Sequence, residues 1–296
     1  MLLDPQTLAG IGDLELVSKR IVDGTVTGLH RSPFHGYSAE FSQYRHYRPG
    51  DDLKYVDWKL FARTDRLYTK QFRETTNLQA QIALDASASM DYAGGSGVTK
   101  FAYARLLAAA IAHLVSGQGD AVGLVTYADA IRQYLPRRGG PPHLRALLAS
   151  LARERPSGGT RAGAALGRTV DLLDRRGLLF VMSDLYDEDE TVMQALTRAS
   201  HVGHEVVVFQ VLTRAEIDLP YSGQIEIEDP ETRQRVLTDG RAARAGYREA
   251  MAAFVERWRS RAAALGIDYV RVFTDVPLDA ALRSYLRSRM SAGARP

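Results

Sequence analysis

The feature that most constrains this fold is an alternation of apolar runs and amphipathic stretches from residue 79 onward. The apolar runs predict strands buried on both faces, and the amphipathic stretches between them predict helices. Because such alternation is typical of parallel sheets, we expect an α/β fold: a doubly wound, mostly parallel sheet with helices on both faces. The predicted strands are 81–84, 122–127, 178–182, 205–212 and 268–273, and the predicted helices are 100–116, 143–152, 162–175, 189–200 and 240–264.

The first part of the chain has a different pattern. Apolar residues recur at helical spacing over 8–21, which predicts a first helix, and residues 28–77 are rich in aromatics, glycine and charge with short alternating runs. Such runs indicate short antiparallel strands. We therefore expect a helix and a small β-rich module in residues 1–78, followed by the α/β domain in 79–296.

The alternation of strands and helices is interrupted once, after the fourth strand. Residues 224–237 alternate in polarity around Pro230, a residue suited to a turn, which predicts a hairpin inserted at about 221–239. The long helix then follows, and the stretch from Leu278 to about Met290 predicts a final amphipathic helix.

Composition excludes some classes of protein. Cysteine is absent, so disulfides and thiolate metal sites are excluded. No run of about 18 apolar residues is present, and the first residues lack the pattern of a signal peptide. These features predict a cytoplasmic protein without a membrane span. The net charge of +3 is weak evidence for an acidic partner.

Oxygen-bearing side chains gather at the predicted strand ends. Asp85 ends the first strand, and Ser87 and Ser89 follow at alternate positions. Thr160 follows two glycines just before a predicted helix, and Asp184 follows the third strand. Ligands of open α/β sheets bind beyond the carboxyl ends of strands, so we expect these five side chains at one edge. Such hard ligands suit Mg²⁺ or Mn²⁺.

This order of residues resembles the metal-ion-dependent adhesion site of von Willebrand factor A-type domains. The resemblance implies that Ser87, Ser89 and Thr160 hold the metal directly or through water, while Asp85 and Asp184 act mostly through bound waters. Many family members have glycine after the last aspartate, where this chain continues Leu-Tyr-Asp. The alternative interpretation is that Asp85 and Ser87 only cap the turn before the next helix.

A second resemblance lies in the N-terminal part. Residues 46–58 read His-Tyr-Arg-Pro-Gly-Asp-Asp-Leu-Lys-Tyr-Val-Asp-Trp. This run resembles the signature of the bacterial family called domain of unknown function fifty-eight (DUF58), with Lys54 in place of the usual arginine. The resemblance covers roughly residues 15–215. It implies a role beside a MoxR-type AAA+ ATPase, because such genes are frequently neighbours.

The charged residues of this segment also have a structural interpretation. Asp51 and Asp52 follow a Pro-Gly turn, where carboxylates accept backbone donors or pair with arginines. We expect an ion-paired network that also includes Asp57, next to Trp58, and that holds the β-rich module together. The arginines predicted to take part are Arg45, Arg48 and Arg63.

Three functions are compatible with the sequence. The first is a metal-dependent adaptor or scaffold whose cation recognises an acidic side chain on a protein partner. The second is a nucleic-acid-binding protein that uses the basic, aromatic residues 30–73. The third is a phosphohydrolase with Asp85 as nucleophile. Because no phosphate-binding loop, nucleophile elbow or zinc-protease motif is present, we expect an adaptor and not an enzyme.

Overall fold

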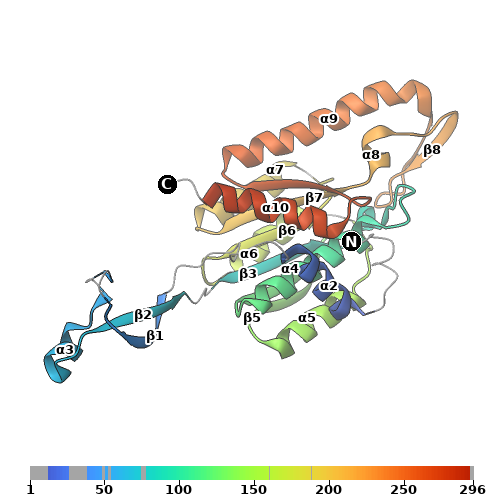
Figure 1. The fold of residues 1–296 in the computed structure, drawn as a ribbon. Helices are drawn as coiled ribbons and strands as arrows, with labels where there is room; N and C mark the ends of the chain where they lie inside the picture. Colours follow the sequence, from blue (N-terminus) through green and yellow to red (C-terminus); the bar gives the residue numbers. More distant parts are fainter. Residues whose placement is uncertain are drawn as a thin grey trace. The chain divides into compact units, whose positions relative to one another are not determined.

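A six-stranded sheet forms the centre of the larger of two compact units (Figure 1). A computed structural model describes residues 13–26, 39–48, 51–52, 55–74, 78–159, 161–187 and 189–293. The strand order is β10-β7-β6-β3-β4-β5, and every neighbouring pair is parallel except β4 with β5. The five predicted strands are the five parallel ones, which confirms the α/β fold class. They are β3 (Gln79–Asp85), β4 (Ala121–Tyr127), β6 (Leu178–Ser183), β7 (Glu205–Leu212) and β10 (Asp268–Phe273).

The sixth strand, β5 (Ile131–Arg138), was not predicted. It lies at the edge of the sheet, antiparallel to β4, and its residues are only half-buried. Its sequence is mostly polar and contains Pro136, which an edge strand tolerates because one side of its backbone has no partner. The apolar run used to predict the other strands is absent here.

Helices cover both faces of the sheet. On one face, α4 contacts α2, α5 and α10, and Tyr285 of α10 packs edge-on against Phe209 of β7. On the other face, α6, α7 and α9 share a buried cluster with the sheet that includes Leu166, Val192 and Trp258. The bounds are α2 (Leu14–Val26), α4 (Lys100–Gly117), α5 (Pro141–Arg153), α6 (Ala162–Asp171), α7 (Asp189–His201), α9 (Gly240–Ala264) and α10 (Leu278–Gly293).

The central helix α4 explains an unusual sequence pattern. It is apolar around most of its circumference because the sheet and three other helices surround it. None of the described helices combines the length and the apolar run that crossing a bilayer requires.

The position of α2 corrects the predicted domain boundary. We expected the first helix to belong with the N-terminal module of residues 1–78. Contacts instead group α2 with Gln79–Pro296, and α2 packs on α4 and α10. Val17 and Ile21 of α2 are fully buried, although a pattern read along the chain does not reveal which surface covers them. The part of the predicted helix before residue 13 lies outside the described residues.

The second unit, Phe34–Leu78, contains the predicted antiparallel strands. They are β1 (Ala39–His46) and β2 (Tyr68–Glu74), which pair with each other. A short helix between them, α3 (Trp58–Thr64), was not predicted. Its N-cap is Asp57, whose carboxylate accepts the backbone N–H groups of Lys59 and Leu60 and the hydroxyl of Tyr44.

The expected ion-paired network is confirmed at Asp51. The Arg45 guanidinium donates to both Asp51 oxygens, at 2.8 and 2.9 Å, and the Arg48 backbone N–H donates to one of them at 2.9 Å. These contacts, the Arg48 N–H first, hold the pKa of Asp51 below its usual value. Since the charge of Arg45 is matched within the unit, it is a weaker candidate for a phosphate contact than the sequence alone indicates.

The predicted hairpin is also confirmed. After the short helix α8 (Arg214–Asp218), β8 (Gln224–Glu228) pairs antiparallel with β9 (Arg235–Asp239) as a separate two-stranded sheet. Asp239 then caps α9 by accepting the N–H groups of Arg241 and Ala242. The hairpin therefore leads directly into the long helix.

Candidate metal centre

The candidate site lies at the carboxyl ends of β3 and β6, where the strand order reverses. The chain passes from β3 to β4 on one side, and β6 later joins β3 on its other side. Such a switch point leaves a crevice between the two strand ends. Asp85 is the last residue of β3 and Asp184 directly follows β6, with exposed fractions of 0% and 1%. The structure thus brings together two of the predicted ligands that are 99 residues apart in the sequence.

Asp85 is fully buried and accepts two hydrogen bonds. One carboxylate oxygen accepts the Ser87 backbone N–H at 2.9 Å, and the other accepts the Ser183 hydroxyl at 2.6 Å. Burial and the nearby charge of Asp184 nevertheless raise the pKa of Asp85 to about 7. The surroundings therefore disfavour its charged form unless a cation lies close by.

The two predicted serine ligands point at each other. Their hydroxyl oxygens are 3.0 Å apart, and both residues are buried. The Ser87 side chain makes no capping hydrogen bond, although Ser87 precedes a short 3₁₀ turn, and helix α4 is capped instead by Thr99. The alternative interpretation, in which Asp85 and Ser87 only cap a turn, therefore holds for the Asp85 carboxylate but not for the Ser87 hydroxyl.

The loop that carries the third predicted hydroxyl runs beside these serines. The Ser157 N–H donates to the Ala86 carbonyl and the Ala88 N–H donates to the Gly158 carbonyl, each at 2.9 Å. Thr160 itself lies outside the described residues, so its place in the site stays a prediction. Beyond it, the Asp187 carboxylate accepts the N–H of Ala162 at 2.6 Å and so caps α6.

A buried lysine, which the sequence analysis missed, completes the group. The Lys100 ammonium is 2.7 Å from Asp184 and 2.5 Å from Glu216, and its side chain is 1% exposed. Burial alone lowers the pKa of Lys100, but the two carboxylates outweigh it and the pKa lies above its usual value. Nothing in the sequence points to Lys100, which is the first residue of an apolar helix. The capping box of Thr213 and Glu216 was readable from its spacing.

The departure from the usual glycine has a local consequence. Leu185, which follows Asp184, has a φ of +64°, in the left-handed region that glycine favours. Its side chain is buried in the core shared by α6 and α7, and its N–H is held by the Ser183 hydroxyl at 2.9 Å. The loop therefore keeps a glycine-like backbone with a leucine, because core packing opposes the local strain.

A divalent cation fits this group of donors. Hydroxyl and carboxylate oxygens are the ligands of Mg²⁺, and adjacent oxygens that each lie about 2.1 Å from such an ion are about 3 Å apart. The Ser87 and Ser89 hydroxyls have that separation. No group of three His, Cys, Asp or Glu side chains that would hold a metal occurs in the part of the chain that the structure describes, so a cation here needs the hydroxyls.

The charge of the group supports the same conclusion. With Asp85 ionised, it holds three carboxylates (Asp85, Asp184 and Glu216) against the single ammonium of Lys100. Two of the buried negative charges then have no matching positive charge, and burying an unmatched charge costs free energy. One divalent cation supplies the two positive charges required.

The strand order and the helices on both faces define a doubly wound α/β domain, as the sequence predicts. The chain belongs to the family described as "Protein of unknown function DUF58", whose model matches residues 43–257. An uncharacterized protein of Mycobacterium tuberculosis, Rv1480, is 32% identical over 233 residues, which are 77% of this chain and 72% of that one. The uncharacterized protein YeaD of Bacillus subtilis is 28% identical over 46% of this chain and 31% of its own.

Two solved structures are similar to this chain at lower sequence identity. An aerotolerance-related membrane protein from Bacteroides fragilis has a TM-score of 0.50 and 19% identity, and the match covers 73% of this chain and 99% of that one. The VWA domain of SpRpn10 has a TM-score of 0.41 and 14% identity, over 69% and 94% of the two chains. At these identities the likeness concerns the fold alone.

Proposed function

We propose that the protein is a metal-dependent adaptor or scaffold. Asp85, Ser87, Ser89 and Asp184, with Thr160 by resemblance to the adhesion site, hold Mg²⁺ or Mn²⁺, and the cation accepts an acidic side chain of a protein partner. The observation that carries this proposal is the pair of hydroxyls 3.0 Å apart beside two buried aspartates, in a group whose three carboxylates face a single ammonium.

The same geometry argues against catalysis. A nucleophile needs an exposed reacting atom and a base within hydrogen-bonding reach. Asp85 is 0% exposed, and both of its oxygens already accept hydrogen bonds. The described residues that line the adjoining cleft include no histidine. These features support partner binding over phosphate hydrolysis with Asp85 as nucleophile.

The partner that we propose is a MoxR-type AAA+ ATPase in the cytoplasm, on the basis of the family resemblance. Purification of the protein from its native host, with and without chelator, tests this assignment when the bound proteins are identified by mass spectrometry. An AAA+ ATPase recovered only in the presence of metal is the expected result. Recovery that is unchanged by chelator would contradict a metal-dependent contact.

The metal site is tested by titration calorimetry with Mg²⁺ and Mn²⁺. The double variant Ser87→Ala and Ser89→Ala removes two ligands and should lose binding and the metal-dependent rise in melting temperature. Ser200→Ala, on α7, is the matched control and should bind like the wild type. Equal Mg²⁺ affinity in the wild type and the double variant would remove the basis of the proposal.

A further inference from the structure

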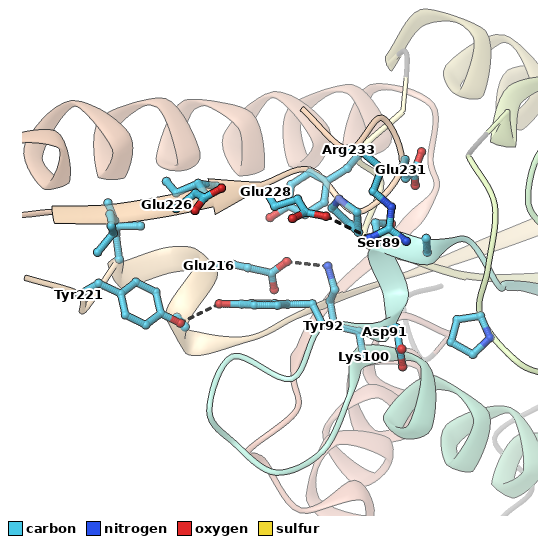
Figure 2. Close-up of a pocket in the computed structure, with 18 of the residues that line it drawn as sticks. Ser89, Asp91, Tyr92, Lys100, Glu216, Tyr221, Glu226, Glu228, Glu231 and Arg233 are labelled. Carbon is cyan, nitrogen blue, oxygen red and sulfur yellow. Dashed lines mark hydrogen bonds and ion pairs between the residues drawn. The ribbon is translucent and has the colours of Figure 1, made fainter. Parts of the chain in front are cut away.

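A large cleft opens directly beside the candidate metal site. Its volume is about 940 Å³, and Ser89 and Lys100 are among its lining residues (Figure 2). Other parts of the wall come from the 156–158 loop, from α8, from the inserted hairpin and from α9, all within the larger unit. The hairpin therefore extends a small ion site into a cleft large enough for side chains of a partner.

Four tyrosines line this cleft: Tyr92, Tyr186, Tyr221 and Tyr247. The first three are 37%, 38% and 41% exposed, so a large part of each is open to a ligand. Tyr92 and Tyr221 share a hydrogen bond of 2.8 Å between their hydroxyls, which links the segment after the serines to the base of the hairpin (Figure 2). The cleft thus presents several fixed aromatic rings.

Two of these rings already lie beside a cation of the protein itself. The Lys100 ammonium lies 4.9 Å from the centre of the Tyr186 ring and 5.9 Å from that of Tyr92. Both distances are within the range of cation–π attraction. The aromatic wall is therefore suited to a second positive group on its open side.

The charge of the cleft also favours a cation. Five carboxylates line it, against the two positive groups of Lys100 and Arg233 in the lining and Arg235 beside them, which pairs with Glu226 at 3.1 Å and with Glu228 at 2.8 Å. Lys100 is paired as described and Arg233 pairs with Glu228 at 3.0 Å, so the carboxylates outnumber the positive groups by two. A divalent cation at the metal site would balance the charges of Asp85 and Asp184. The excess of negative charge in the cleft would therefore remain. The lining carboxylates are those of Asp91, Glu216, Glu226, Glu228 and Glu231.

We propose that this cleft binds an arginine side chain of a protein partner. A guanidinium stacks flat on tyrosine rings and offers paired N–H donors to carboxylates, which a lysine ammonium does not. This inference goes beyond the proposed function. The metal takes a carboxylate of the partner, whereas the acidic, aromatic cleft takes a positive group presented beside it.

Fluorescence anisotropy at physiological ionic strength tests the proposal with a labelled hexapeptide of alternating arginine and serine. The same peptide with citrulline at the arginine positions keeps the shape and loses the charge. We expect the arginine peptide to bind the wild type at least tenfold more tightly than the citrulline peptide and several-fold more tightly than a lysine version. Equal binding of the arginine and citrulline peptides would overturn the proposal.

Variants locate the binding site. Glu226→Gln with Glu231→Gln removes two charges from the cleft, and Tyr221→Ala removes a ring, so each should weaken the arginine peptide at least tenfold. Glu190→Gln with Glu256→Gln removes two exposed charges from α7 and α9 and is the matched control, expected to change affinity by less than twofold. An equal loss in both double variants would mean attraction to net charge alone and would refute the assignment.

The outcomes for the cleft and the metal site can be separated. None of the substituted cleft residues is a proposed metal ligand, so Mg²⁺ binding measured by calorimetry should be unchanged in the cleft variants. If the wild type binds the arginine peptide but no Mg²⁺, the cleft assignment stands and the metal-dependent function fails. If Mg²⁺ binds and the arginine peptide does not, the reverse holds.

Discussion

Replacement of Lys100 by methionine is the most direct test of how the buried charges are balanced. The substitution keeps a long, flexible side chain, so it leaves little empty volume beside Tyr186. It removes the only ammonium that contacts Asp184 and Glu216 among the described residues. Both carboxylates then stay almost buried, with side chains 2% and 11% exposed and no matching positive charge.

The expected size of the effect follows from this burial. Breaking a buried ion pair by removing one partner costs about 3–5 kcal/mol. In a unit of this length, each kcal/mol lowers the melting temperature by about 2–4 °C, so Lys100→Met should lower it by roughly 6–20 °C in chelator. Mg²⁺ should restore more stability to the variant than to the wild type, because it meets an additional unbalanced negative charge.

Thermal unfolding followed by circular dichroism, in chelator and in excess Mg²⁺, measures both quantities. Lys19→Met is the matched control, because Lys19 is an exposed lysine on α2 of the same unit, and its effect should stay within about 0.5 kcal/mol. The reasoning fails if Lys100→Met is as stable as Lys19→Met in chelator. It also fails if Mg²⁺ stabilises the variant less than the wild type.

Three further predictions concern single side chains. Asp187→Ala removes the acceptor for the Ala162 N–H at the start of α6 and should cost about 1 kcal/mol in urea unfolding. Asp57→Ala removes the N-cap of α3 and should increase amide hydrogen exchange in that helix by about fivefold, corresponding to about 1 kcal/mol, without affecting α4. Because burial and Asp184 raise the pKa of Asp85 from 3.8 to about 7, the folded state in chelator retains a proton that the unfolded chain has released between these values. The wild type should therefore lose unfolding free energy as pH rises through that range, whereas Asp85→Asn should lack this contribution, and equal pH slopes would contradict it.

The ends of β3 and β6 carry the side chains whose meeting follows from sequence pattern and sheet topology together. Asp85, Ser87, Ser89 and Asp184 were predicted because apolar strand runs ended in oxygen-bearing residues. Strands of a parallel sheet place those ends at one edge, so local pattern and topology together predict the meeting. Lys100 was not predicted, because an apolar run that begins with lysine gives no indication of whether the ammonium points to water or into the core.

The sequence by itself determined the five parallel strands, the helices between them and the hairpin, since hydrophobic period and turn residues are properties of short segments. Only the tertiary structure decided that α2 packs on α4, that the polar β5 completes the sheet edge, and that Glu216 pairs with a lysine 116 residues earlier in the chain. It also decided that the hairpin forms one wall of a cleft beside the candidate metal site. These features depend on which surfaces meet after the chain has folded, and contacts between distant segments leave no periodic trace in either segment.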